Sequence, residues 1–196
     1  MPEPNCMKII IPGGRGQIGQ ILTRDLLTSG HEVVVLSRRP GKLFQHQEYR
    51  SVNWDGELCH PSLTREFESA DVVINLAGRS VNCRFDRANR KAILDSRVNS
   101  TKAVDEAIRN SGFSGVWLQS STAPIYADRY DAGNNETDGI IGGQEPDLPE
   151  TWKFSIDVAR AWEQTAIEHC VDNVRLGLMR SAMIMSPGTN GVFEPA

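Results

Sequence analysis

Residues 7–19 read Met-Lys-Ile-Ile-Ile-Pro-Gly-Gly-Arg-Gly-Gln-Ile-Gly, an apolar run followed at once by a glycine-rich loop. The apolar run predicts a buried strand, and the spacing of apolar residues over 18–26 predicts an amphipathic helix. Gly13, Gly16 and Gly19 have the spacing of a turn that brings backbone close to a pyrophosphate at a helix start. Glycines alone also fit a tight strand–helix connection without a ligand. With strand and helix both present, the stretch predicts dinucleotide binding.

Strand-like runs recur along the chain, separated by segments long enough for crossover helices. Several are continuously apolar, as in parallel strands that helices cover on both faces. Segments 86–110 and 154–169 carry apolar residues at helical spacing, and 132–151 is a polar loop. We therefore expect one α/β domain over residues 1–196, a Rossmann-type doubly wound parallel sheet with helices on both faces. The expected strands are Lys8–Ile11, Val33–Ser37, Tyr49–Asn53, Val72–Leu76, Val116–Ser120 and Val174–Met179.

The composition of the 196 residues narrows the classes of function. A net charge of −4 gives no general attraction to nucleic acid, so we expect no nucleic-acid partner. The chain shows no secretory leader and no apolar run of membrane-spanning length, which predicts a cytoplasmic protein without a membrane partner. Four cysteines lie far apart without metal-ligand spacing, so we expect no metal site and no disulfide framework. They are Cys6, Cys59, Cys83 and Cys170.

The end of the second expected strand indicates which dinucleotide binds. An acidic residue there favours NAD, whereas an arginine accommodates the additional phosphate of NADP. This chain has Ser37-Arg38-Arg39, and a guanidinium offers phosphate oxygens a planar fork of donors. The alternative is that both arginines only solvate a strand end. With the glycine loop upstream, the sequence favours NADP(H) over NAD(H).

Four further motifs add to the glycine loop: Leu36-Ser37-Arg38-Arg39-Pro40, Val73-Ile74-Asn75-Leu76-Ala77-Gly78, Asp95-Ser96-Arg97-Val98-Asn99-Ser100-Thr101 and Trp162-Glu163. Together they resemble the extended or atypical short-chain dehydrogenase/reductase superfamily, in its sugar epimerase-like branch, the NAD-dependent epimerase/dehydratase family. The resemblance spans nearly the whole chain. The cofactor contacts that it implies are Gly13, Gly14, Arg15, Gly16, Gln17, Ile18, Gly19, Ser37, Arg38, Arg39, Leu76, Ala77, Gly78, Arg97, Ser120 and Met183.

The resemblance also implies where catalysis occurs. Segment 120–126, Ser-Ser-Thr-Ala-Pro-Ile-Tyr, is similar to the superfamily's Ser-Ser-x-x-x-Val-Tyr-Gly, with Thr122 where the catalytic hydroxyl stands. Tyr126 is the second candidate catalytic residue. The superfamily's Tyr-x-x-x-Lys pair is absent, because Ser155 and Ala159 occupy its positions, and a shift of one residue brings Phe154 and Val158 instead. The sequence thus supports cofactor binding more strongly than proton transfer.

Two functions follow from these observations. The first is an NADP(H)-dependent oxidoreductase or nucleotide-sugar epimerase-like enzyme that acts on a small polar substrate. The second is a non-catalytic NADP(H)-binding module that senses redox state or serves in assembly. A basic cluster over 79–91 could hold an anionic substrate or could simply be a solvated helix start, and it is all that favours an RNA-binding module, which ranks last. The oligomeric state stays open, a homodimer included.

Members of this superfamily continue beyond the sixth strand, and much of their substrate lobe comes from that later part. The sequence given ends at residues 192–196, so the resemblance implies that most of the lobe is lacking here, either because this is part of a longer protein or because it is a natural short form with an open substrate pocket. Segment 180–188 resembles the exit from the sixth strand, where backbone meets the nicotinamide end, and Met183 is the candidate contact there.

Overall fold

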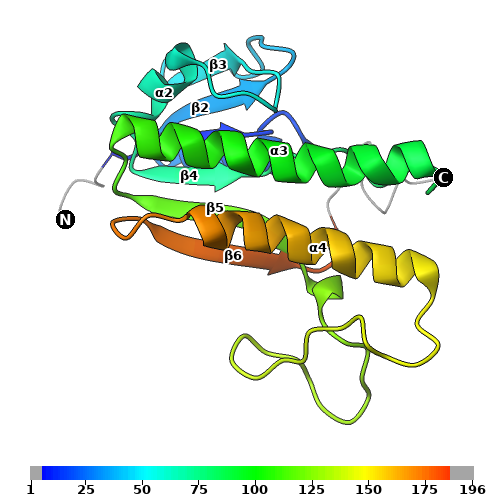
Figure 1. Cartoon of the computed structure of the whole chain (residues 1–196). Coiled ribbons are helices and arrows are strands. Elements are labelled where there is room, and N and C mark those ends of the chain that lie inside the picture. Colours follow the sequence, from blue (N-terminus) through cyan, green and yellow to red (C-terminus); the bar gives the residue numbers. More distant parts are fainter. Residues whose placement is uncertain (1–5, 186–196) are drawn as a thin grey trace.

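The computed structural model describes residues 6–185, without the side chain of His169. In this part of the chain, six parallel strands form one sheet in the order β3-β2-β1-β4-β5-β6 (Figure 1). β1 pairs with both β2 and β4, so the strand order reverses at β1 and leaves a crevice at the carboxyl ends of these strands. The order is that of the Rossmann fold. The strands are β1 (Lys8–Pro12), β2 (Glu32–Ser37), β3 (Tyr49–Asn53), β4 (Val72–Asn75), β5 (Val116–Thr122) and β6 (Arg175–Ser181).

Helices cover the two faces of the sheet unequally. They are α1 (Gln17–Thr28), α2 (Pro61–Phe67), α3 (Arg87–Ser111) and α4 (Glu150–His169), with a short 3-10 turn η1 (Ala123–Ile125). On one face Leu27 of α1 packs with Ile9, Ile11 and Val33. On the other face α2, α3 and α4 cover a core centred on Phe67 and Trp117, and α3 and α4 lie side by side across the sheet (Figure 1). The expected parallel sheet with helices on both faces is confirmed.

The connection between β2 and β3 differs from the expected crossover helix. Residues 38–48 form no helix, and they contain Pro40 and Gly41, which both disfavour a helix interior. Phe44 instead packs edge-on against Tyr49, with ring centroids 5.3 Å apart, and joins the core on the α1 face. A single aromatic side chain thus replaces a helix as cover for this end of the sheet.

Two strand ends bear on the site. β5 continues to Thr122, two residues further than expected, and Thr122 is in register with Ser181 at the end of β6. After η1 a long loop over 127–149 extends away from the sheet before α4 begins (Figure 1). The carboxyl ends of β5 and β6 therefore adjoin the start of α4.

Within residues 6–185, no helix has both the length and the apolar character needed to cross a membrane.

Candidate active site

The glycine loop between β1 and α1 is packed so closely that side chains do not fit. Gly13 has φ +78°, and a Cβ there would lie 2.8 Å from the backbone of Ala77, after β4. A Cβ on Gly19 would lie 2.4 Å from Cα of Gly14. Gly16 is exposed and is the N-cap of α1. The loop therefore holds the start of α1 at the crevice, where first-turn N–H groups attract an anion.

A groove of about 360 Å³ runs along the carboxyl ends of β1, β2 and β4. Among the expected cofactor contacts it is lined by Gly13, Arg15, Gly16, Ser37, Arg38, Leu76, Ala77 and Gly78. Gly14 of the loop and Gly19 of α1 are instead buried. Arg39 does not line the groove, and its backbone N–H donates to Ser37 Oγ at 3.2 Å. The structure thus separates the two neighbouring arginines, with Arg38 alone at the groove.

Sequence reasoning missed part of this groove. Residues 54–57, directly after β3, line it, as do Ser96 and Ser100 of α3. Arg79 also lines it and adds a third guanidinium to those of Arg15 and Arg38. The predicted strand at 49–53 could have revealed residues 54–57 as groove residues, because the carboxyl ends of neighbouring parallel strands meet at one edge of the sheet.

Buried amides hold the end of β4 in place. Asn75 Nδ2 donates to Gln119 Oε1 of β5 at 2.9 Å, and both side chains are fully buried. Asn75 Oδ1 accepts from the Ala77 N–H at 3.1 Å. This pair fixes the turn after β4, so that Leu76 and Ala77 face the groove.

A second cavity, of about 560 Å³, lies between the start of α1, the ends of β5 and β6, and α4. Leu76 lines both the groove and this cavity, so the two adjoin. The structure brings together here the remaining expected contacts and one expected catalytic residue. They are Gln17, Ile18, Arg97, Ser120, Met183 and Thr122. Of the expected exit segment at 180–188, residues 186–188 lie outside the described part of the chain.

Arg97 of α3 is held firmly at the second cavity. Its guanidinium donates to the carbonyl oxygens of Arg79 and Ile93, each at 3.1 Å, and lies 4.9 Å from the ring centre of Trp162. Burial lowers the pKa of Arg97. The side chain therefore joins α3, α4 and the loop after β4.

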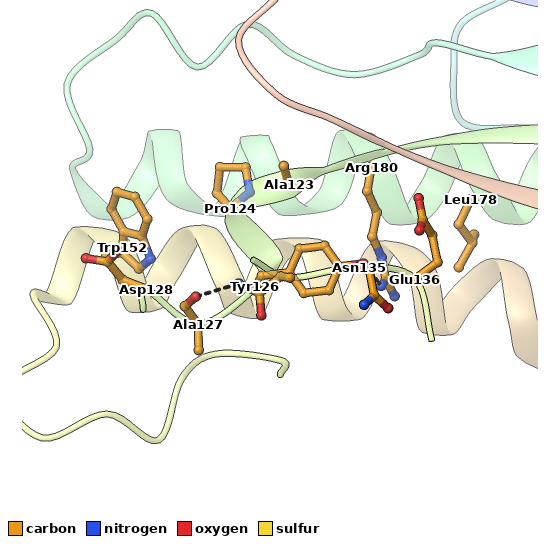
Figure 2. Close-up of a pocket in the computed structure, with 11 residues that line it drawn as sticks. Ala123, Pro124, Tyr126, Ala127, Asp128, Asn135, Glu136, Trp152, Leu178 and Arg180 are labelled. Atoms are coloured by element: carbon orange, nitrogen blue, oxygen red, sulfur yellow. Dashed lines mark hydrogen bonds between the residues drawn. The ribbon is translucent and has the colours of Figure 1, made fainter. Parts of the chain in front are cut away.

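Tyr126 lines a different cavity, of about 730 Å³, beside the loop at 127–149 (Figure 2). Arg180 Nη1 donates to its hydroxyl oxygen at 2.7 Å. Arg180 also forms two hydrogen bonds with Glu163, at 2.8 and 2.7 Å, and this carboxylate raises the pKa of Arg180. Glu163 further accepts from Ser121 Oγ. Thr122 and Tyr126 thus line different cavities, which adjoin because Pro124 and Trp152 line both.

The positions of the superfamily's Tyr and Lys face the second cavity. Ser155 and Ala159 both line it, as do Phe154 and Val158 of the alternative register. Ser155 Oγ donates to the Thr151 carbonyl at 3.1 Å. The described residues that line this cavity include no Tyr, Lys, His, Asp or Glu. Neither register therefore places a Tyr–Lys pair at the cavity wall.

Several basic residues of the cluster at 79–91 are paired individually with other side chains. Arg90 pairs with Glu150 at 2.6 Å, and Lys91 pairs with Asp95. Arg79 donates to Asn89 at 2.7 Å. Acidic and amide groups thus engage much of the cluster.

Within residues 6–185 no group of three or more His, Cys, Asp or Glu is placed to hold a metal ion.

Comparisons with known proteins agree with this geometry. Residues 9–142 match the model of the NAD dependent epimerase/dehydratase family. The epimerase family protein SSP1921 of Staphylococcus saprophyticus is 26% identical over 186 residues, which cover 90% of this chain and 55% of that protein. The chain spans about half the length of such relatives.

Solved structures show the same fold. The crystal structure of the human epimerase family protein SDR39U1 (isoform 2) with NADPH has a TM-score of 0.73 at 26% identity, covering 95% of this chain and 57% of that one. UDP-glucuronic acid 4-epimerase of Bacillus cereus in complex with NAD has a TM-score of 0.72 at 17% identity, covering 92% and 58%. With its Rossmann sheet, its glycine loop and a family match over most of its length, the chain belongs to the NAD dependent epimerase/dehydratase family.

Proposed function

We propose that this protein binds NADP(H) across the groove and the second cavity, and that it acts as an NADP(H)-dependent oxidoreductase or epimerase-like enzyme on a small molecule. The observation that carries the proposal is the position of Arg15 and Arg38. Arg38 follows the end of β2, Arg15 follows β1, and both residues line the groove beside Gly13 and Gly16, with Asp55 and Glu57 as its acidic members. A 2′-phosphate at the end of β2 would meet two planar donors.

The groove fits the dinucleotide in two further respects. A side chain at Gly13 or Gly19 would collide with backbone, so the tight turn brings the start of α1, with its first-turn N–H groups, to the crevice where a pyrophosphate would bind. Ser37 ends β2 where an NAD-specific protein places a carboxylate. NADPH in the crystal structure of human SDR39U1 supports the same assignment.

The second cavity would hold the nicotinamide end, next to Leu76 and Ser120. A bound nicotinamide supplies or accepts a hydride. Thr122, at the end of β5, faces this cavity, and its hydroxyl would polarise the reacting oxygen of the substrate. The remaining sequence predictions stay part of the proposal: residues 1–196 form the dinucleotide-binding domain of a cytoplasmic protein, which could be a homodimer.

Calorimetric titration of the protein with NADPH and NADH tests the cofactor assignment. We expect Arg38→Asp to weaken NADPH binding at least tenfold, about 1.4 kcal/mol, and to change NADH binding little. Arg39→Asp is the matched control, because Arg39 does not line the groove, and it should leave NADPH affinity nearly unchanged. An equal loss for both cofactors would refute the phosphate role of Arg38.

The second candidate function is a non-catalytic NADP(H)-binding module. It is favoured by Ser155 and Ala159, which replace the expected acid–base pair at the cavity wall. General acid–base catalysis contributes roughly 10²–10⁴-fold to rates, so its loss lowers turnover of ordinary ketones. Tight NADPH binding without oxidation of NADPH by any carbonyl compound would favour this module.

A further inference from the structure

About half of the residues that line the second cavity are aromatic or branched apolar, and five others carry a hydroxyl group. Phe85, before α3, and Phe154 of α4 lie with ring centres 5.7 Å apart. Trp152 and Trp162 of α4 also line the cavity, as does Val81 on the loop after β4. Trp152 is 42% exposed and Val81 is 55% exposed, so the apolar wall continues to the surface. Such walls favour flat, apolar ligands.

Charge in this cavity does not suit a nucleoside diphosphate. Of the described residues that line it, Arg97 alone carries a charge. Its guanidinium already donates to two carbonyl oxygens and stacks on Trp162. A sugar diphosphate would leave most of its oxygens without a cationic partner, which is costly away from water. Within the described residues, the cavity therefore offers the diphosphate of a nucleotide sugar a single cation.

The hydroxyl groups of the cavity also favour a quinone over an ordinary ketone as the substrate. Thr122 and Ser155 can donate hydrogen bonds, but a hydroxyl does not release its proton near neutral pH. Reduction of an ordinary ketone produces an alkoxide, which needs an acid beside it. Reduction of a quinone produces a phenolate, whose conjugate acid titrates near pH 10, as in tyrosine, and which water can protonate.

We infer that the second cavity binds a flat, conjugated dicarbonyl compound of the quinone class, and that the protein reduces it with NADPH. This inference rests on the proposed function. The C–H bond of the reduced nicotinamide breaks as its hydride forms an O–H bond at one carbonyl oxygen of the quinone, and the nicotinamide becomes oxidised. The electron pair moves through the conjugated ring onto the other carbonyl oxygen, and this phenolate takes a proton from water to complete the hydroquinone. Thr122 donates a hydrogen bond to this second oxygen, where the charge develops.

Binding is tested apart from turnover. 2-Methyl-1,4-naphthoquinone is titrated by calorimetry into the full chain saturated with NADP⁺, and UDP-glucose is titrated in parallel. We expect the quinone to bind and UDP-glucose not to bind. Val81→Asp, which places a carboxylate in the apolar wall, should weaken quinone binding at least tenfold. Leu58→Asp is the matched control, because Leu58 is equally exposed at 56% and lies outside the cavity, and it should change nothing.

Turnover is followed by the absorbance of NADPH with the same quinone, against a reaction without protein. We expect oxidation that requires the protein and that Val81→Asp lowers at least tenfold. Binding of UDP-glucose in place of the quinone, or equal quinone affinity in the two variants, would overturn the inference. If NADPH binds but the quinone neither binds nor is reduced, the inference fails and the proposed cofactor function stands. If neither NADPH nor NADH binds, the proposed function itself fails.

Discussion

Arg180 and Glu163 form a two-point ion pair between β6 and α4, with Nε and Nη2 of the arginine donating to the two carboxylate oxygens. The Glu163 side chain is 6% exposed and that of Arg180 is 24% exposed. The carboxylate also accepts from Ser121, and the guanidinium donates to Tyr126. The pair thus joins the end of β5, β6 and α4, and it links Ser121, which lines the second cavity, to Tyr126, which lines the cavity beside the loop at 127–149.

We expect Arg180→Met to lower the free energy of unfolding by about 3 kcal/mol, because it leaves the buried Glu163 carboxylate without its cation. Urea denaturation measures the change. Arg175→Met, at the exposed start of the same strand, is the matched control and should cost well under 1 kcal/mol. Similar losses in the two variants would show that the ion pair does not stabilise this sheet edge.

Gly13→Ala should destabilise the protein and abolish NADPH binding. The added Cβ would lie 2.8 Å from the Ala77 backbone, in addition to the strain of a positive φ. Gly30→Ala separates the two effects, since Gly30 has φ +83° but no atom near the added Cβ. It should cost about 1 kcal/mol, the strain alone, and leave NADPH affinity intact. Thermal unfolding and calorimetry measure both quantities, and normal NADPH binding by Gly13→Ala would contradict the close approach.

Thr122→Val should lower the rate of NADPH oxidation roughly 100-fold, the usual effect of removing one hydrogen-bond donor from a reacting oxygen. Tyr126→Phe should leave that rate nearly unchanged, because its hydroxyl is bonded to Arg180 at another cavity. It should instead lower the free energy of unfolding by about 1 kcal/mol. The absorbance of the reduced nicotinamide reports the rates. A large rate loss in Tyr126→Phe alone would reverse the two assignments.

The carboxyl group of Asp131 should titrate at an acidic pH in the folded protein. Hydrogen bonds from Arg129 lower its pKa from 3.8 to about 2. Because the folded pKa is lower than the unfolded one, the stabilisation is complete above about pH 4 and is lost as the pH falls toward 2. Carbon NMR of the side-chain carboxyl measures this titration. In Arg129→Gln the pKa should return toward 3.8, and an unchanged value would assign the shift to backbone donors instead.

Features that depend on neighbours along the chain could be predicted from the sequence. The apolar runs of β1 and β2 form strands because their side chains must be buried on both faces of a parallel sheet. The turn at Gly13 needs a residue without Cβ, and the arginine after β2 reaches the groove by its position alone. Pro40 and Gly41 are a local signal against a helix at 38–48, but the packing of Phe44 against Tyr49 is a contact that no local pattern reveals.

The sequence by itself determined the succession of strands along the chain, the glycine turn and the arginine after the second strand, since steric freedom and apolar periodicity are local properties. Only the tertiary structure decided which distant side chains share a cavity. It placed Trp54 and Glu57 at the groove and Ser155 at the same cavity as Thr122, and it turned Tyr126 toward Arg180. These neighbours meet because parallel strands end at one edge of the sheet, and packing of α4 against that edge sets which side chains face each cavity.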